Sequence, residues 1–327
     1  MTSADAGRPF ASLSPDAVID AAESVGIACD GRLFALNSYE NRVYQVGSTS
    51  HATVIMKIYR PGRWSDRQIE EEHAFARELL DEELPVVAPT AFEGRTLLRH
   101  GQLRFAVFPR AAARSAEFES PGALELIGRT LARIHGVGQR RRFDARPALS
   151  VARLGWEPRE ALLRSGLLDE AVASRYEEAS GALLEAVEEA FERVGPVSAL
   201  RIHGDCHVGN ILWNERGPVF VDLDDCMTGP RVQDLWMFLS GSPDERRSQW
   251  REIERGYSQF QYFDEGELGL VEPLRALRMV HHAAWIAARW SDPAFPRAFP
   301  WFTSPRFWQE HLSDLWQQLD AVGHPPM

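Results

Sequence analysis

Oxygen-bearing side chains gather in two neighbouring stretches of the chain, "HGDCHVGNILW" at 203–213 and "VFVDLDD" at 219–225. Four residues separate Asp205 from Asn210, and Asp222 follows one predicted β-hairpin later. A carboxylate can orient a hydroxyl group and accept its proton, whereas an amide oxygen and a second carboxylate are ligands that Mg²⁺ prefers. This spacing therefore indicates transfer of a phosphoryl group from a magnesium-bound nucleotide to a hydroxyl.

The same stretches also contain side chains of types that bind zinc or catalytic metal pairs. His203, Cys206, His207 and Cys226 are plausible zinc ligands, but structural zinc sites show two regularly spaced pairs and the chain has no CxxC. "GDCH" is similar to the GDxH element of metallophosphatases, which need further ligands from separate loops. No GNH[DE] element and no upstream DxH is present, so phosphoryl transfer is the interpretation we favour.

A nucleotide-binding lysine is expected on an earlier strand, paired with a glutamate on the helix that follows it. Lys57 lies in "TVIMKIYRP", where apolar neighbours on both faces indicate a buried strand, so its charge needs a partner. The helix predicted at 65–80 carries Glu70, Glu71 and Glu72. Glu72 shares the apolar face of this helix and is the partner we favour, while Glu71 stays open because helical register is uncertain by one residue.

The segment "LNSYENRVYQV" at 36–46 lies between two predicted strands, where a loop that covers nucleotide phosphates belongs. It contains no GxGxxG pattern, but Asn37 and Ser38 can offer turn amides and a hydroxyl to phosphate oxygens. An ordinary hairpin turn explains the local residues nearly as well. The position of the segment just before Lys57 favours a nucleotide contact through Ser38.

Strand-like segments dominate the first third of the chain, and helical periodicity dominates the rest. With 327 residues, 44% of them hydrophobic, the chain can bury either one large core or two smaller ones. The sequence predicts an α+β fold with two lobes, a nucleotide-binding lobe at 1–109 and a catalytic and substrate lobe at 110–327, with a hinge near 108–114. The first lobe combines an antiparallel sheet with one long helix. The second is mostly helical around the hairpin "NILW"–"NERG"–"PVFVD", with helices predicted at 123–138, 157–168, 170–194, 232–240 and most of 243–318.

Composition excludes several classes of protein. The formal net charge of −11 argues against a generic nucleic-acid binder, which brings a basic surface to the phosphates. No apolar run approaches the roughly 18 residues of a membrane span, and the first residues do not read as a signal peptide. Three scattered cysteines do not form a disulfide framework. We expect a cytoplasmic monomer.

The motifs resemble those of the aminoglycoside phosphotransferase/choline kinase family, a branch of the protein-kinase-like fold. "HGDCHVGN" is similar to its HGDxxxxN loop, "FVDLDD" to its metal-binding element, and "DLW" at Asp234 to the aspartate that braces the loop. The resemblance implies ATP and Mg²⁺ as cofactors. It implies that Asp205 is the proton acceptor, that Asn210 and Asp222 bind magnesium, with Asp222 catalytically essential, and that Ser38 contacts ATP.

Within this family the chain most resembles bacterial stress-response kinases, over nearly its whole length. The resemblance is carried by "NSYENRVYQV", "MKIYRPGRW", "EEHAF", "QDLWMFLSG" and "RMVHHAAWIAARW". It implies a Ser/Thr protein kinase that acts in envelope and oxidative stress. Departures from ordinary protein kinases are Gly204 in place of an arginine, no DFG, no APE and a short activation segment. A small-molecule phosphotransferase, acting on an aminoglycoside or a choline-like amino alcohol, is therefore the alternative.

A nucleotide-sensing module without transferase activity is a third hypothesis, and the complete set of catalytic residue types argues against it. Histidine and cysteine side chains in or near the site have more than one interpretation. We expect His203 to shape its loop rather than to do chemistry. Cys206 is either an inert buried thiol or a redox switch, since reactivity needs a lowered pKa and exposure. His281 and His282, beside Trp285 and Trp290, are expected to pack or to line a substrate groove.

Overall fold

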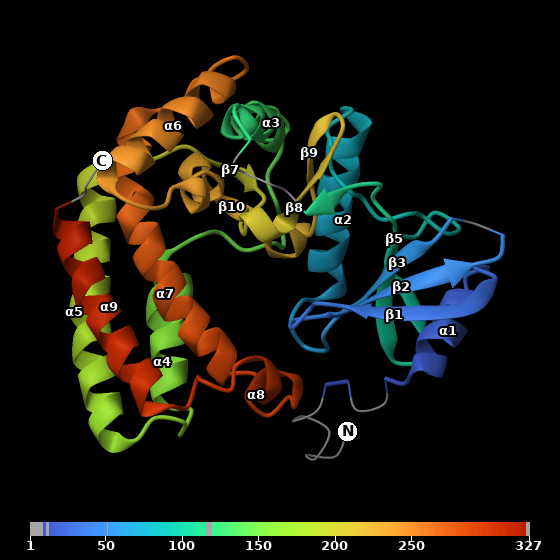
Figure 1. Ribbon diagram of the computed structural model, residues 1–327, viewed down its shortest axis with the longest axis horizontal. Helices are drawn as coiled ribbons and strands as arrows, with labels where there is room; N and C mark the ends of the chain where they lie inside the picture. The colour runs from blue at the N-terminus through green and yellow to red at the C-terminus, as the bar shows by residue number, and fades with distance from the viewer. Residues whose placement is uncertain (1–8, 11–12, 51, 116–119, 325–327) are drawn as a thin grey trace.

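The computed structural model describes residues 9–10, 13–50, 52–115 and 120–324. A small β-rich lobe and a larger helical lobe lie side by side, as Figure 1 shows. The elements occur in the predicted order, with the sheet first and the helices after it. The fold is therefore the α+β arrangement expected from the sequence.

The N-terminal lobe is a five-stranded antiparallel sheet in the order β1-β2-β3-β5-β4. Alternate residues of the central strands, such as Met56, Ile58, Phe105 and Val107, are buried against the apolar face of α1. The two-residue period places Lys57 on the opposite face of the sheet, where it is also buried. The elements are α1 (Pro15–Glu23), β1 (Cys29–Leu36), β2 (Arg42–Ser48), β3 (Val54–Ile58), α2 (Asp66–Asp81), β4 (Leu98–His100) and β5 (Leu103–Pro109).

Helix α2 begins one residue after Ser65, which forms a capping box with Gln68. Its buried residues recur at helical spacing and include Glu72, Phe75 and Leu79. Phe75 and Leu79 belong to the same hydrophobic core as the helices of the second lobe. Helix α2 therefore connects the two lobes as well as carrying the predicted partner of Lys57.

The C-terminal lobe is built from helices around a short hairpin. Strands β8 and β9 pair antiparallel, with Ile211 opposite Phe220, which confirms the predicted hairpin. Helix α5 packs against α7 and α9, and α4 packs against α7 (Figure 1). The helices are α3 (Ala123–Gly138), α4 (Glu157–Leu163), α5 (Glu170–Val194), α6 (Pro243–Tyr257), α7 (Val271–Ala287), α8 (Ala294–Ala298) and α9 (Pro305–Gly323), and the strands are β6 (Arg114–Ser115), β7 (Ala199–Ile202), β8 (Ile211–Asn214), β9 (Gly217–Phe220) and β10 (Met227–Pro230).

Several predicted boundaries are wrong. The helix expected at 232–240 consists of two 3₁₀ turns, η4 (Arg231–Asp234) and η5 (Trp236–Phe238), because Asp234 and Gln233 turn inward to bind the catalytic loop. The helix expected at 157–168 ends at Leu163 and is preceded by a π-helical turn, η1 (Ala152–Trp156). The remaining short turns are η2 (Val208–Asn210), η3 (Leu223–Asp225) and η6 (Glu265–Leu270). No helix of the described residues is long and apolar enough to cross a membrane.

Helices α3 and α6 approach each other closely at two glycines. A Cβ atom added to Gly128 would overlap the carbonyl oxygen of Ile253, and one added to Gly256 would overlap that of Glu125. Backbone atoms cannot move aside as a flexible side chain can. The crossing therefore depends on the absence of side chains at both positions.

Gly256→Ala tests this contact. We expect a loss of about 1–3 kcal/mol in the free energy of unfolding, because the added methyl group forces the two helices apart. Gly323→Ala in α9 is the control, since its Cβ would meet nothing within 4 Å. In urea unfolding, the control should leave the midpoint unchanged or raise it slightly. Equal shifts for the two variants would contradict the proposed role of Gly256.

Candidate active site

A buried aspartate, Asp234, binds the backbone of the loop that carries Asp205. Asp234 accepts hydrogen bonds from the backbone N–H groups of His203 and Gly204, each at 2.8 Å. Its carboxylate also lies 3.1 Å from the ring of His135 in α3. Asp234 is fully buried, so within the described part of the chain its carboxylate depends on these three groups for hydrogen bonds. Asp234 thus has the bracing geometry that the "DLW" motif predicted.

Gly204 has a conformation that only glycine readily adopts. Its φ is +87°, and a Cβ atom there would overlap the carbonyl oxygen of Asp225. The arginine that precedes the catalytic aspartate in many kinases has no room in this loop. Because no arginine can occupy position 204, a phosphorylated activation loop has no arginine at this position to bind.

Local hydrogen bonds give the catalytic loop its shape. The side-chain amide of Asn210 and the backbone N–H of His207 both donate to the carbonyl of Asp205, each at 3.0 Å. The buried ring of His203 hydrogen-bonds the carbonyl of Val221, at the end of the hairpin. His203 therefore shapes the loop, as expected.

The carboxylate of Asp205 faces two basic side chains. Arg278 of α7 donates to Oδ1 at 2.5 Å, and His207 Nε2 lies 3.4 Å from Oδ2. Burial alone would raise the pKa of Asp205, but the hydrogen bond with His207 and the charge of Arg278 hold it well below its usual range. Asp205 is therefore ionised and able to accept a hydrogen bond from a hydroxyl. The contact with Arg278 carried no signal in the sequence.

Lys57 lies at the base of the site among three carboxylates. Its ammonium nitrogen is 2.8 Å from Asp222 Oδ1, 2.9 Å from Asp224 Oδ1 and 3.5 Å from Glu72 Oε1. Burial alone would lower the pKa of Lys57, but these carboxylates raise it well above its usual value. Burial also raises the pKa of Glu72 to about 7, against the opposing effect of Lys57.

Glu71, the alternative partner of Lys57, has a different contact. Its carboxylate accepts hydrogen bonds from the backbone N–H groups of Asp144, Ala145 and Arg146, at 2.8–3.0 Å. Neighbouring glutamates on α2 therefore point in different directions, Glu72 to the lysine and Glu71 to a loop of the other lobe.

Asp224 and Arg63 are members of the site that the motifs did not single out. Arg63 forms ion pairs with Asp224 and, at 2.6 Å, with Asp225. Burial alone would raise the pKa of Asp224, but the charges of Arg63 and Lys57 hold it well below its usual range. The further aspartates of "VDLDD" were a signal that Lys57 could have a second acidic partner after Asp222. Nothing in the sequence pointed to Arg63.

The residues predicted to bind magnesium fit that metal by their donor atoms. Asp222 has a left-handed φ of +59°, and its side chain is 51% exposed next to the cavity. Asn210 uses its amide nitrogen on the Asp205 carbonyl, which leaves its oxygen available as a ligand. Two protein oxygens, with water and phosphate oxygens completing the shell, are typical of a nucleotide-bound Mg²⁺.

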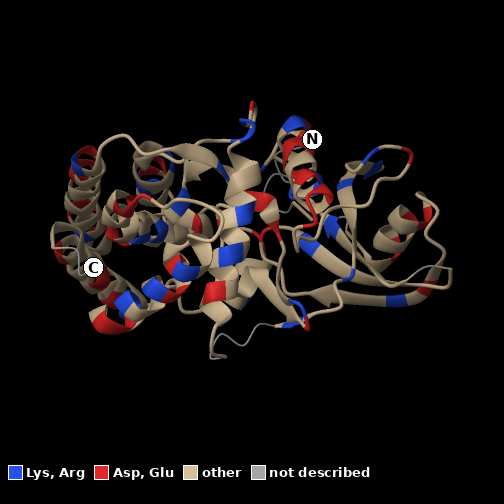
Figure 2. Ribbon diagram, turned by 90° about the horizontal axis from the view of Figure 1, so that it is seen from above, with Lys and Arg blue, Asp and Glu red and all other residues tan. Residues whose placement is uncertain are grey.

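A cavity of about 1330 Å³ joins these groups between the lobes. Its lining includes Ser38, Lys57, Asp205, Asn210 and Asp222, so all five line one space. Charged residues of both signs gather where the lobes meet, as Figure 2 shows.

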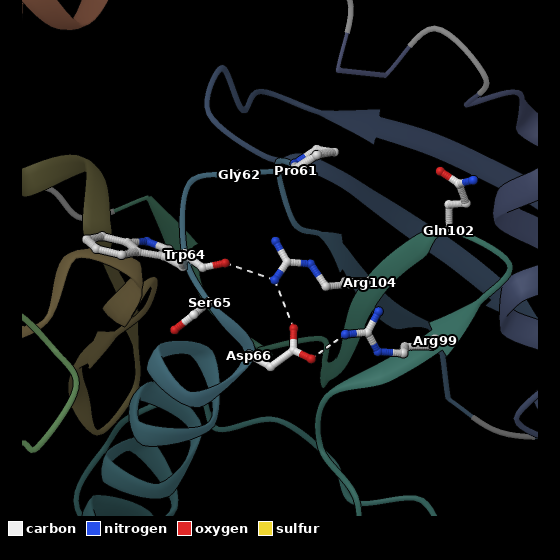
Figure 3. A pocket seen from close by; sticks show the side chains of 8 residues that line it. All are labelled: Pro61, Gly62, Trp64, Ser65, Asp66, Arg99, Gln102 and Arg104. Atoms are coloured by element: carbon white, nitrogen blue, oxygen red, sulfur yellow. Dashed lines mark hydrogen bonds and ion pairs between the residues drawn. The ribbon is translucent and has the colours of Figure 1, made fainter. Parts of the chain in front are cut away.

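A smaller cavity of about 500 Å³ lies at the start of α2, where Asp66 pairs with Arg99 and Arg104 (Figure 3). It contains none of the predicted site residues.

The loop of Ser38 is attached to the opposite lobe. Ser38 Oγ donates to the carbonyl of Asn41, and the adjacent Glu40 pairs with Arg289 and accepts from Trp285, each at 2.6 Å. Asp292, just after α7, pairs with Arg42 and Arg60 at 2.9 and 2.8 Å. These contacts place the loop over the cavity.

Cys206 has the properties of an inert thiol. It is fully buried, and burial together with the charges of Asp234 and Asp205 raises its pKa well above the usual value. A reactive cysteine needs exposure and a lowered pKa. The redox interpretation of Cys206 is therefore not supported by its surroundings.

Comparison with known proteins agrees with this geometry. Residues 33–271 match the model of the phosphotransferase enzyme family. The chain is 43% identical over 318 residues to stress response kinase A of Salmonella choleraesuis (strain SC-B67), covering 97% of this chain and 96% of the relative. It has the same identity and coverage to the serine/threonine protein kinase RdoA of Salmonella typhimurium (strain LT2).

A solved structure of similar fold is the amicoumacin kinase hAmiN, in complex with AMP-PNP and Ca²⁺. The TM-score is 0.73 at 16% identity, with 100% of this chain and 98% of that chain covered. This likeness concerns the fold, whereas the family model and the relatives at 43% identity concern descent. The chain belongs to the phosphotransferase enzyme family and is an ATP-dependent phosphotransferase.

Proposed function

We propose that the chain is a cytoplasmic Ser/Thr protein kinase of the stress-response type, which transfers the γ-phosphoryl group of ATP to a protein hydroxyl. The observation that carries the proposal is that Lys57, Asp222 and Asp205 line one cavity between the lobes. The names of relatives at 43% identity, a stress response kinase and a serine/threonine protein kinase, support a protein acceptor and a role in the stress response.

In this proposal each residue has one task. Lys57, held by Glu72, binds the nucleotide phosphates, and Ser38 contacts them from the covering loop. Asn210 and Asp222 hold Mg²⁺, which neutralises the phosphate charge when bound. Asp205 orients the acceptor hydroxyl and takes its proton as the oxygen–phosphorus bond forms and ADP leaves.

The same division of tasks applies to the lobes. We propose that residues 1–109 bind the nucleotide and residues 110–327 provide catalysis and acceptor binding, with the hinge near 108–114. The position of Lys57 in β3 and of Asp205 after β7 supports this division.

A transfer assay with γ-labelled ATP and Mg²⁺ tests the acceptor class. An acidic and a basic generic protein are offered beside a panel of aminoglycosides, choline and amino alcohols. We expect label on protein, either on an added substrate or on the chain itself. Label on small molecules alone would overturn the protein-kinase proposal in favour of the small-molecule alternative.

Asp205→Asn tests the catalytic assignment. The amide cannot take the hydroxyl proton, so we expect kcat to fall by about 10²–10⁴-fold. Nucleotide affinity, measured by calorimetry with a non-hydrolysable ATP analogue, should change little because Lys57 and Asp222 are intact. Asp320→Asn in α9 is the control, since Asp320 is 82% exposed and outside the cavity. Wild-type turnover in Asp205→Asn would rule out the assignment.

A further inference from the structure

One face of α7 forms a wall of the cavity next to Asp205. The residues of this wall recur at spacings of three, four and seven and continue into the turn after the helix, so they share one side. None of them is acidic, and the acidic residue of α7, Glu272, is buried in pairs with Arg246 and Arg275. The wall consists of Arg278, His281, His282, Trp285 and Arg289.

Two arginines of the wall, Arg278 and Arg289, together with Arg63, place positive charge near its histidines. Desolvation, together with repulsion from Arg289, Arg278 and Arg63, lowers the pKa of His281 to about 4. His282 has a lowered pKa for the same reasons, with Arg278 as its cationic neighbour. Because both pKa values lie below the usual range, both rings are neutral at neutral pH. Both are also exposed and line the cavity, so they can form hydrogen bonds there.

Two of the cations have partners that do not take part in transfer. Arg289 pairs with Glu40 in the covering loop, and Arg63 pairs with Asp224 and Asp225. Arg278 differs, because among the described residues its partner is Asp205 itself. Its side chain is 42% exposed, so it can leave Asp205 without disturbing the core.

The acceptor hydroxyl and Arg278 compete for the same carboxylate. Asp205 Oδ1 accepts from Arg278 at 2.5 Å, and Oδ2 faces His207. A hydroxyl that binds Asp205 therefore weakens the pair with Arg278 or displaces it. A guanidinium that loses its partner beside a bound acceptor is stabilised if the acceptor brings an anion.

We propose that Arg278 selects acceptors in which the target serine or threonine is flanked by a carboxylate or phosphate group. Arg278 covers Asp205 in the resting site and binds the flanking anion when the hydroxyl takes its place on Asp205. This inference rests on the proposed protein-kinase function. The transfer step is unchanged: the acceptor oxygen bonds to the γ-phosphorus, the bond from the γ-phosphorus to the β,γ-bridging oxygen breaks, ADP leaves and the hydroxyl proton passes to Asp205.

Four peptides that differ only beside the target serine test the proposal. The flanking residues are glutamate, phosphoserine, glutamine or lysine. We expect kcat/KM for a glutamate or phosphoserine peptide to exceed that of the glutamine peptide by about tenfold, in line with a charge-assisted hydrogen bond. The lysine peptide should be the poorest acceptor. Comparing glutamate with phosphoserine distinguishes the two sources of the anion.

Variants of Arg278 show whether this residue makes the selection. Arg278→Gln should raise KM for the anionic peptides about tenfold and remove their advantage over glutamine, while KM for ATP stays as in the parent. Arg278→Lys keeps the charge and should retain part of the advantage. Arg306→Gln in α9 is the control, because Arg306 is 87% exposed and pairs only with Glu310 among the described residues.

The outcomes are distinguishable. If lysine or glutamine peptides are phosphorylated as well as the anionic ones, or if Arg278→Gln keeps the preference, the inference is overturned and the proposed function stands. If label reaches small alcohols and no peptide or protein, both are overturned. The peptide series on the parent protein decides the preference even if Arg278→Gln does not fold.

Discussion

Burial of the Lys57 ammonium is the constraint on which the rest of the structure depends. A buried charge costs several kcal/mol unless opposite charges and hydrogen bonds surround it. Here the partners are Glu72 of α2 and Asp222 and Asp224 after β9. These residues come from distant parts of the chain, so satisfying Lys57 brings the sheet, α2 and the hairpin to one point. The cavity exists because the lobes meet there.

Three carboxylates around one ammonium leave an excess of negative charge, and cations from other elements offset it. Arg63 pairs with Asp224, and Arg146 donates to the carbonyls of Asp224 and Cys226. Arg278 of α7 does the same for Asp205. The site therefore combines acidic and basic side chains, each carboxylate lying beside at least one cation.

Local patterns predicted the parts of the site that a short segment builds. The spacing of Asp205 and Asn210 lies within one loop, and the hairpin that returns Asp222 has its own turn residues. The choice of Glu72 over Glu71 followed from the apolar face of α2. The helix expected at 232–240 was wrong, because Asp234 turns inward to accept two buried N–H groups and interrupts the helical pattern. Short apolar runs do not distinguish such turns from a helix.

The sequence by itself determined the two-lobe order, the catalytic loop, the hairpin and a buried lysine that needs an acidic partner. These features follow from periodicity and spacing over a few residues, which chain geometry converts directly into position. Only the tertiary structure decided that Arg278 contacts Asp205, that Arg63 joins Asp224 and that Glu40 and Asp292 attach the covering loop to α7 and its end. Those pairs join residues 73 to 250 positions apart. An ion pair can form between residues at any separation along the chain. The sequence therefore does not reveal which residues pair, and the packing of the lobes decides it.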